Sequence, residues 1–595
     1  MILEFLDWII IVSFLILFVW IGVSFRKTAS KSLENFFLGG RNLPWYVAGT
    51  SMVATTFAAD TPLAVSEIVQ KNGVAGNWIW WCFLTGGILT TFFFSRYWRR
   101  ANILTELELI DIRYSGPEAK FLRLFKAIYL GLFMNILIIG WVNLAFISII
   151  QVFFGIDFST AMYITFGVMT LAVVYSSASG LLGVAITDMV QFAVAMVGCI
   201  ILAVLVLNSD EVGGMANLKQ NLAPEYFNFF PSFDSGNTVA TLGLSIGAFF
   251  SFFAVQWWAS WYPGSEPGGG GYIAQRMMST RTEKDSLYAT LFFQIAHYCI
   301  RPWPWIIVAL CAVYLYGNNG VMDPESMSQF SESSRLGFVF TMRDFLPVGL
   351  KGLLLVAFIS AYLSTISTQL NWGASFIVND FIKPLKLTKE ESLVKSGRWV
   401  TLILMLFGVA ITNFITSISG VWEFIIECGA GLGLVLILRW YWWRINAWSE
   451  ITAIIAPFVG FTIGKLFLEP SLDESFLINK GTYLFTVGFS TISWILVTYL
   501  TKSTETVVLR SFYKRVKPLG NWKRFSGNTS NKPLLNLIGA WISALGLVYS
   551  ALFFIGYLLF LEYTLAVIWL SVGITSSLIF YQRLKSIDFT KIKIF

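Results

Sequence analysis

Long apolar runs, rather than alternating or amphipathic patterns, organise this chain. A run of about 20 apolar residues is long enough to cross the hydrocarbon core of a bilayer as a helix. The sequence contains 15 such runs, so it predicts an all-α polytopic membrane protein with about 15 transmembrane helices. The predicted spans are residues 5–25, 44–70, 74–98, 121–153, 158–175, 181–207, 236–262, 286–316, 345–382, 394–419, 421–445, 447–470, 478–501, 535–560 and 563–582.

The basic residues between these runs predict the orientation. With the N-terminus outside, 33 of the 41 Lys and Arg residues fall in cytoplasmic segments, seven fall outside, and Arg301 lies within a span. Lys and Arg accumulate in the cytoplasmic loops of membrane proteins. We therefore expect an outside N-terminus, an inside C-terminus and a multi-pass location in the cell (plasma or inner) membrane.

Composition agrees with a membrane protein and excludes several classes. Hydrophobic residues make up 56% of the chain and charged residues 13%, against roughly 25% charged residues in soluble domains. This excludes a cytosolic enzyme, a nucleic-acid binder and a secreted scaffold. The net charge of +7 is explained by cytoplasmic loops near anionic headgroups, so no nucleic-acid partner is expected. A single histidine, His297, excludes a multi-histidine metal centre, and the five cysteines, all in apolar runs, are expected to be buried thiols.

The first polar interruption lies in the second span. Residues 54–62 read ATTFAADTP. Pro62 cannot donate a helical hydrogen bond, and it disfavours helix at Thr61. A break here frees carbonyl groups that could coordinate a cation, and Asp60 adds a charge at membrane depth. The alternative is an ordinary proline kink with Asp60 paired to a helix end.

The second interruption is a set of hydroxyls in the ninth span. Ser364, Ser367 and Thr368 follow at i, i+3 and i+4, so they share one helix face, and Thr365 lies beside them. Hydroxyl and carbonyl oxygens are hard ligands that suit a small hard cation. The alternative is a packing face of small residues whose hydroxyls bond back to helix carbonyls.

Isolated ionisable residues form the third group: Asp188, His297, Arg301, Glu423 and Glu427. Each is costly in lipid unless it is paired or faces a wet cavity. For His297 we expect a neutral imidazole bonded to a neighbouring helix rather than a proton relay.

Aromatic residues gather at two further places. Trp78, Trp80 and Trp81 lie in the third span. A second group ends the seventh span, and the segment 263–271 (PGSEPGGGG) follows it. That segment lacks the Lys-Ser/Thr ending of a phosphate-binding loop, so we interpret it as a hinge or spacer.

Four motifs together resemble one family. They are FFLGGR at 36–41 followed by LPW at 43–45, SGLLGVAITD at 179–188 with Gln191, YIAQR at 272–276, and the ninth-span run that ends in Asn379-Asp380. From the first to about the thirteenth span, the chain is similar to the sodium:solute symporter family, which contains sodium–glucose, sodium–proline and sodium–sialic acid carriers.

The resemblance implies a five-plus-five inverted repeat of the leucine-transporter type, with discontinuous helices near the midplane. No internal repeat is clear from the residues themselves. The implied divisions are an N-terminal accessory helix and cytoplasmic loop (1–43), a first repeat (44–207), an extracellular loop (208–235), a second repeat (236–445), and C-terminal accessory helices (446–595) with a basic cytoplasmic loop (502–534).

The resemblance also implies ligands for sodium. The first site would use Ala54, Phe57, Ala361, Ser364 and Thr365. These residues fall on the two polar interruptions described above. A second sodium site would use Asp188, Ser364, Ser367 and Thr368. The alternative is that Asp188 bonds only to those hydroxyls or pairs with a cytoplasmic basic residue.

Departures from the family pattern bear on the solute. Sugar carriers place Gln and Glu where this chain has Thr61 and Trp80, and Lys where it has Arg301, so matching sugar ligands are absent. Arg301 would suit a carboxylate, and the tryptophans suit a sugar ring or a cationic group. The residues expected at the cavity or its gate are Asp60, Thr61, Trp80, Trp257, Trp258, Trp261, Tyr262 and Arg301.

We therefore expect a sodium-coupled symporter, not an enzyme, that takes up a small polar solute (sugar, amino acid or carboxylate) by alternating access, with Na⁺ as coupling ion and no other cofactor. One alternative is a proton-coupled carrier using Asp60, Glu427 or His297. Another is a membrane sensor acting through a partner, because only residues 585–595 follow the last span and they hold no kinase region. An intramembrane hydrolase has no nucleophile–base pair to support it.

Overall fold

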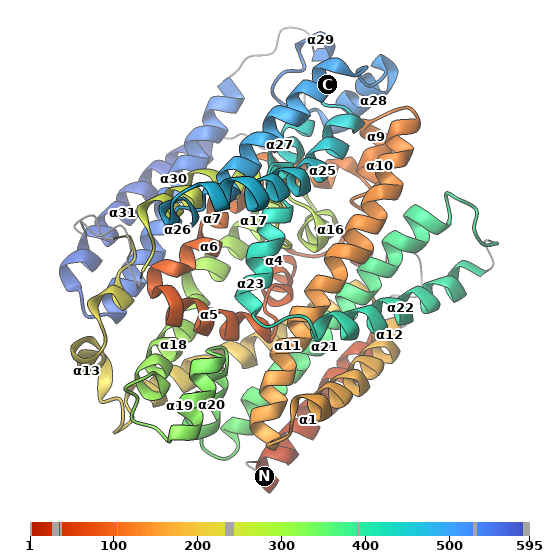
Figure 1. Ribbon diagram of the computed structural model, residues 1–595. Coiled ribbons are helices and arrows are strands. Elements are labelled where there is room, and N and C mark those ends of the chain that lie inside the picture. Colours follow the sequence, from red (N-terminus) through yellow and green to blue (C-terminus); the bar gives the residue numbers. More distant parts are fainter. Residues whose placement is uncertain are drawn as a thin grey trace.

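The computed structural model describes residues 3–25, 35, 38–103, 105–231, 243–389, 392–526 and 532–586. This part of the chain is helical, with two isolated β-bridges (Figure 1). Within it, nine helices are long and apolar enough to cross a membrane, or eleven if each of two sharply bent pairs counts as one span. The number 15 and the orientation of the termini stay predictions. The start of the FFLGGR motif, residues 236–242 of the predicted seventh span, and the basic residues in 26–34 and 587–595 lie outside the described residues.

The elements of the first half run from α1 to α13. They are α1 (Phe5–Ser24), η1 (Gly39–Arg41), α4 (Trp45–Thr55), α5 (Asp60–Asn72), η2 (Val74–Asn77), α6 (Trp78–Trp81), α7 (Phe83–Phe93), α8 (Ser95–Ala101), α9 (Glu108–Arg113), α10 (Pro117–Ile128), η3 (Tyr129–Met134), α11 (Asn135–Phe154), α12 (Phe158–Leu207) and α13 (Gly214–Asn221).

The second half begins after a 3₁₀ turn, η4 (Pro224–Phe227). Its elements are α14 (Ile246–Phe250), η5 (Ser251–Gln256), α15 (Trp257–Ala259), α16 (Gly271–Ser279), α17 (Glu283–Ile295), η6 (Ala296–Ile300), α18 (Pro302–Tyr316), α19 (Pro324–Glu332), α20 (Leu336–Phe345), α21 (Leu350–Phe376), η7 (Ile377–Ile382), α22 (Leu393–Thr412), α23 (Ile418–Cys428) and α24 (Leu432–Tyr441). The C-terminal elements are α25 (Ala447–Ile463), η9 (Gly464–Leu468), η10 (Glu469–Ser471), α26 (Glu474–Ile478), α27 (Gly481–Leu500), α28 (Thr506–Val516), α29 (Lys523–Ser526), α30 (Lys532–Leu559) and α31 (Tyr563–Ser586).

Helix α21 occupies a central position in the packing. It lies against α12, α11, α22 and α4, while α30 and α31 pair with each other at one edge of the molecule (Figure 1). The N-terminal end of α21 is held by α1: the Asp7 carboxylate accepts hydrogen bonds from the backbone N–H groups of Gly349 at 2.7 Å and Gly352 at 2.8 Å. The N-terminus of α21, whose first N–H groups have no helical partner, is therefore capped by an accessory helix.

Helix α12 departs most from the predicted spans. The sequence predicted two separate spans, 158–175 and 181–207, but the structure has one uninterrupted helix from Phe158 to Leu207. No proline interrupts this segment, and isolated glycines among Ala and Ser residues weaken a helix without ending it. Within α12, only Leu181–Leu207 has the length and hydropathy of a membrane span.

Two predicted loops contain helices that the search for long apolar runs did not find. Helices α19 and α20 lie between the eighth and ninth predicted spans, and α28 lies in the basic loop. In α28, Leu509, Phe512 and Val516 are buried and share one face at helical spacing. That face packs on α8 and α9. Runs of about 20 apolar residues cannot reveal such short amphipathic helices.

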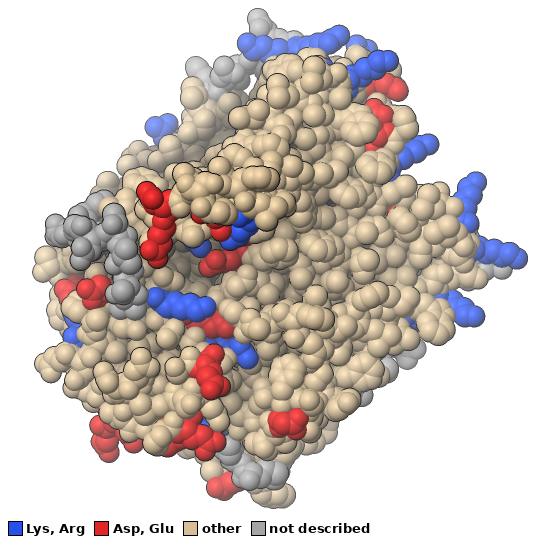
Figure 2. All heavy atoms as spheres, viewed as in Figure 1, with Lys and Arg blue, Asp and Glu red and all other residues tan. Residues whose placement is uncertain are grey.

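Most of the surface visible in Figure 2 carries no charged residues. Lys and Arg gather near α28 and α29 and at the tip between α21 and α22, and Asp and Glu are more frequent toward α19 and α20. Charged residues of both signs also gather left of the centre of Figure 2, and a broad uncharged zone lies to their right, as expected of a face in contact with lipid.

Candidate functional site

The predicted break in the second span is present. Helix α4 ends at Thr55 and α5 begins at Asp60, and the residues between them are not helical. Phe57 N–H donates to Ala54 O at 2.9 Å, and Thr61 N–H donates to Ala58 O at 3.4 Å. Because Thr61 bonds to Ala58, the carbonyl of Phe57 loses the helical donor it would otherwise have. Pro62 supplies no N–H at all. The break thus exposes backbone oxygen at membrane depth.

Helix α21 passes this break without interruption. Phe57 stacks on Phe358 of α21 with ring centroids 6.0 Å apart, which brings the two elements together. One turn further along α21 lies Ala361, which is buried. Thr365 lines a cavity together with Thr55, Thr56 and Ala58. Ser367 Oγ donates to the carbonyl of Ser364 at 3.0 Å, the back-bonded arrangement that the packing alternative described.

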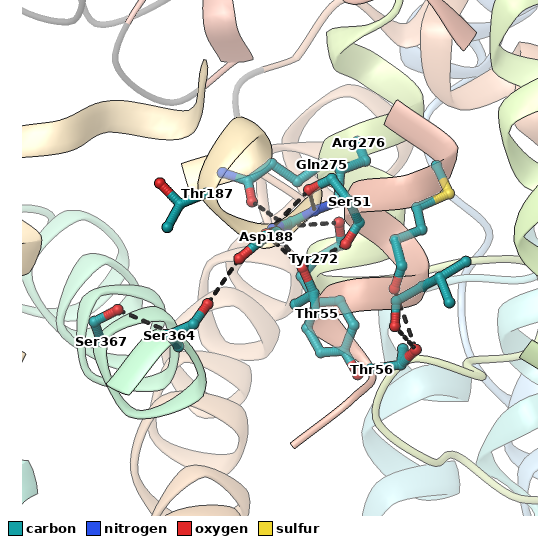
Figure 3. Close-up of polar contacts among 12 residues, drawn as sticks. Ser51, Thr55, Thr56, Thr187, Asp188, Tyr272, Gln275, Arg276, Ser364 and Ser367 are labelled. Carbon is teal, nitrogen blue, oxygen red and sulfur yellow. Dashed lines mark hydrogen bonds and ion pairs between the residues drawn. The ribbon is translucent and has the colours of Figure 1, made fainter. Parts of the chain in front are cut away.

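Asp188 of α12 joins the two elements (Figure 3). The carboxylate is buried, with 2% of its surface exposed. It accepts a hydrogen bond from Ser364 Oγ at 2.8 Å on one oxygen, and Ser51 Oγ and Thr55 Oγ1 of α4 lie 3.3 Å from the other. Asp188 therefore bridges α4 and α21 through hydroxyl groups.

Arg276 of α16 completes this cluster. One guanidinium nitrogen lies 3.9 Å from Asp188 and donates to Thr55 Oγ1 at 2.8 Å, and Nε donates to Ser51 Oγ at 3.2 Å. The YIAQR motif contains Arg276, but sequence reasoning did not place it at the site. Pairing of Asp188 with a basic residue was the alternative to a second sodium site, and Arg276 lies at ion-pair distance from Asp188 in this structure. The second sodium site stays a prediction.

A cavity lies between the break, α6, α7, α11, η6 and α21. Its lining includes Asp60, Thr61, Trp80, Tyr262 and Arg301, five of the residues that the sequence indicated for the cavity or gate. Sequence reasoning missed Trp141, Tyr272, Tyr298, Gln369 and Trp422, which also line it. Tyr272 begins the YIAQR motif, which was recognised without being placed at the cavity. The other four lie within apolar runs, where no spacing in the sequence marks them.

Three of the indicated aromatic residues lie outside this lining. The Trp257 ring faces Trp541 of α30 at 5.8 Å, and Trp258 Nε1 donates one turn back to Ala254 O at 2.7 Å. Trp261 is buried, and its N–H donates to Gly429 O at 3.3 Å, between α23 and α24. Trp257 thus contacts α30 and Trp261 contacts the segment between α23 and α24, whereas the Trp258 bond stays within its own helical stretch.

Arg301 is held by a defined network. Its Nη1 donates to Val53 O at 3.2 Å and to Thr56 Oγ1 at 3.0 Å, and its Nη2 lies 3.3 Å from His297 Nε2. A guanidinium only donates, so Nε2 must accept and the proton of a neutral imidazole sits on Nδ1. Nδ1 lies 3.0 Å from Thr56 Oγ1, which can accept this proton. His297 is therefore an acceptor that orients Arg301, as the bonded-imidazole interpretation expected.

The segment 263–271 is a buried element rather than a solvent-exposed spacer. Gly264, Gly268, Gly269 and Gly271 have φ values from 52° to 81°, which glycine adopts without steric cost. Trp98 Nε1 donates to Gly268 O at 2.8 Å, and the Gly271 N–H donates to Glu106 at 2.7 Å. The glycines allow the loop to pack against these side chains under the cavity.

Glu266 in this loop should make the protein pH-sensitive. Burial and the neighbouring Glu106 carboxylate raise the pKa of Glu266 from 4.5 to about 8. Between these values the folded chain keeps a proton that the unfolded chain releases, so stability falls as pH rises from about 4.5 to about 8. Glu266→Gln mimics the protonated acid. We therefore expect the melting temperature of the variant minus that of wild type to increase from pH 5 to pH 8.

Thermal unfolding in detergent at several pH values measures this difference. The exposed acid Glu211 provides the control Glu211→Gln, which should follow wild type at every pH. Parallel wild-type and Glu266→Gln curves would contradict the prediction.

Comparisons with known proteins give the family. A model of the sodium:solute symporter family matches residues 36–456. The sodium/glucose cotransporter of Vibrio parahaemolyticus is 22% identical over 523 residues, covering 82% of this chain and 91% of the relative. The high-affinity proline transporter PutP of Bacillus subtilis (strain 168) is 24% identical, covering 72% and 86%. The sodium/sialic acid symporter NanT of Aliivibrio fischeri (strain ATCC 700601 / ES114) is 24% identical, covering 70% and 78%.

A solved structure supports the same fold. The substrate-bound outward-open state of a Na⁺-coupled sialic acid symporter matches 84% of this chain and 99% of its own, with a TM-score of 0.63 at 17% identity. The family model covers well over half of the chain, and the relatives above are transport proteins by name. The chain is a member of the sodium:solute symporter family.

Proposed function

We propose that this protein couples sodium movement to the uptake of a small polar organic solute by alternating access. One observation supports this most. The break at 56–59 and a hydroxyl of α21 border the same cavity, and the lining of that cavity includes both an acidic and a basic residue. Ion and solute that bind next to each other stabilise the same state of the protein, and each then raises the affinity for the other.

The first sodium site in this proposal uses carbonyls of Ala54, Phe57 and Ala361 with the hydroxyls of Ser364 and Thr365. Support comes from the Phe57 carbonyl, which the break deprives of its helical donor, and from the contact between Phe57 and α21. Carbonyl and hydroxyl oxygens from a broken helix and a continuous helix supply a hard, uncharged ligand set.

The five-plus-five organisation is the proposed basis of alternating access. Residues 44–207 and 236–445 would form the two repeats, and the accessory segments 1–43 and 446–595 would surround them. In this proposal, the contact of Arg276 with Asp188 belongs to one of the two alternating states, since α16 lies on the side predicted to face the cytoplasm.

A second sodium ion is proposed at Asp188, Ser364, Ser367 and Thr368. Arg276 lies where it competes with such an ion for the carboxylate, so the ion and Arg276 would occupy Asp188 in different states. We expect a wild-type coupling ratio of two sodium ions per solute and a ratio of one in Asp188→Asn, because the amide carries no charge to balance the ion. Reversal potentials of solute flux at several imposed sodium gradients measure the ratio, and a wild-type ratio of one, unaltered by the mutation, would rule out the second ion.

Uptake into proteoliposomes tests the function as a whole. An inward sodium gradient, at equal pH on both sides, should drive accumulation of a solute that a pH gradient alone does not drive. Accumulation driven by protons without sodium would instead favour a proton-coupled carrier. Binding without any accumulation would favour a sensor.

A further inference from the structure

We propose that the transported solute is a zwitterion whose cationic end is bound by Asp60 and whose carboxylate is bound by Arg301. This inference rests on the proposed function, because it assigns the solute class of the same cavity. Its basis is the presence of two opposite charges in one cavity lining.

Both charges are buried without being paired to each other. Asp60 has 4% of its surface exposed and Arg301 has 1%. Among the described residues, no Lys, Arg or His nitrogen lies within 4.0 Å of the Asp60 carboxylate. A buried charge without a partner costs several kcal/mol or more. A solute that brings a positive group to Asp60 would remove this cost.

The position of Asp60 keeps its negative charge available. Asp60 is the first residue of α5, a helix of 13 residues. The N-terminus of a helix carries a partial positive charge that favours a carboxylate. This stabilises the anion from within the protein while leaving its oxygens without a cationic side chain, and the solute can supply that cation.

Arg301 keeps donors for a carboxylate. Its three internal bonds use both hydrogens of Nη1 and one of Nη2. Two of the five N–H groups of a guanidinium therefore remain, one on Nη2 and one on Nε, which is buried and has no partner among the described residues. These are the two donors that the proposal assigns to the solute carboxylate.

Aromatic residues also line the cavity that holds the two charges. Trp80 and Tyr298 stack with centroids 5.8 Å apart, and Tyr262 stacks on Phe83 at 5.3 Å. Aromatic faces attract ammonium groups, including alkylated ones. A sugar would leave both charges unpaired, and a simple monocarboxylate would leave Asp60 unpaired, so the combination favours an amino-carboxylate.

Pairs of probes with equal shape and different charge test the proposal on the full chain in nanodiscs. Glycine betaine and 3,3-dimethylbutyrate have the same shape, but only the betaine carries a positive charge. L-Proline and cyclopentanecarboxylate form a second such pair, and D-galactose serves as a neutral probe. The panel adds the common amino acids and their N-methylated derivatives. The readout is the shift of the melting temperature as a function of probe concentration, in NaCl and in KCl.

We expect at least one zwitterion to bind in NaCl, and its anionic isostere to bind more weakly by about 100-fold, which corresponds to the loss of one buried charge pair. Asp60→Asn should abolish this preference, whereas Asp60→Glu, which keeps the charge, should retain it. The comparison of isosteres on wild type needs no variant and stays decisive if Asp60→Asn fails to fold.

Several outcomes would overturn the zwitterion assignment. They are equal binding of a zwitterion and its anionic isostere to wild type, a preference unchanged in Asp60→Asn, and a panel in which no zwitterion binds. If galactose or an anion binds and requires sodium, the symport proposal stands and the solute class is wrong. If a zwitterion binds equally well in NaCl and KCl, the solute class stands and sodium coupling is wrong.

Discussion

Replacing Ser364 and Thr365 together with alanine should lower the affinity for sodium by about 100-fold or more. Each hydroxyl bound to a charged group contributes roughly 1.5–3 kcal/mol, and the double variant removes two from a site otherwise made of carbonyls. Apparent solute affinity should fall as well, because ion and solute are coupled reciprocally. The measurements are the half-saturation of uptake by sodium and, without solute, the sodium dependence of the melting temperature.

Ser375 offers a matched control on the same helix. Its hydroxyl donates to the carbonyl of Trp372 at 2.8 Å, and it is not in the proposed site. Ser375→Ala should therefore leave the half-saturation for sodium unchanged. An unchanged half-saturation in the Ser364/Thr365 double variant would remove these hydroxyls from the sodium site. Since Ser364 also donates to Asp188, the two single variants show how much of the effect comes through that carboxylate.

Arg301→Ala should weaken solute binding by about 100-fold or more, the range measured when one partner of a buried charge pair is removed. Sodium binding in the absence of solute should remain, since Arg301 is not a proposed sodium ligand. The expectation is a strict test, because Arg301 donates to the carbonyl of Val53, which directly precedes the proposed sodium ligand Ala54. Isothermal titration with sodium alone, and then with solute at saturating sodium, separates the two effects.

Arg301→Lys distinguishes charge from geometry. Lysine keeps the positive charge but not the two-pronged donor arrangement, so we expect it to restore only part of the solute affinity. Wild-type transport by Arg301→Ala would show that this residue does not bind solute, even though it lines the cavity.

Local chemistry made the break and the charged residues predictable. Pro62 removes a helical donor wherever it stands in a span, and a lone Arg301 at membrane depth must find polar partners or a cavity. These statements need no knowledge of neighbouring helices. The polar network around Arg301 and the nonhelical residues between α4 and α5 agree with them.

Tertiary packing decided the features that the sequence left open. Tryptophans at a helix end fit an interfacial belt, a gate or a contact with another helix, and Trp257 packs on Trp541, almost 300 positions later in the sequence. Likewise, Arg276 could be recognised within its motif, but its contact with Asp188 depends on how α16 and α12 both pack on α4. The glycine-rich segment suggested a spacer because its composition says nothing of the Trp98 and Glu106 side chains that cover it.

The two hydrogen bonds between Asp7 and the start of α21 constrain how this helix can take part in a transport cycle. Because the N-terminal end of α21 is bonded to α1, α21 can pivot about that end more readily than it can slide. Gly352 and Ser364 are about 18 Å apart along the helix axis, so a tilt of about 10° displaces Ser364 by roughly 3 Å. A shift of that size is larger than a sodium–oxygen bond. A small rotation about a fixed end would thus be enough to form or disrupt the proposed ion site. Although α1 is peripheral, its contact with α21 would be the pivot of that rotation.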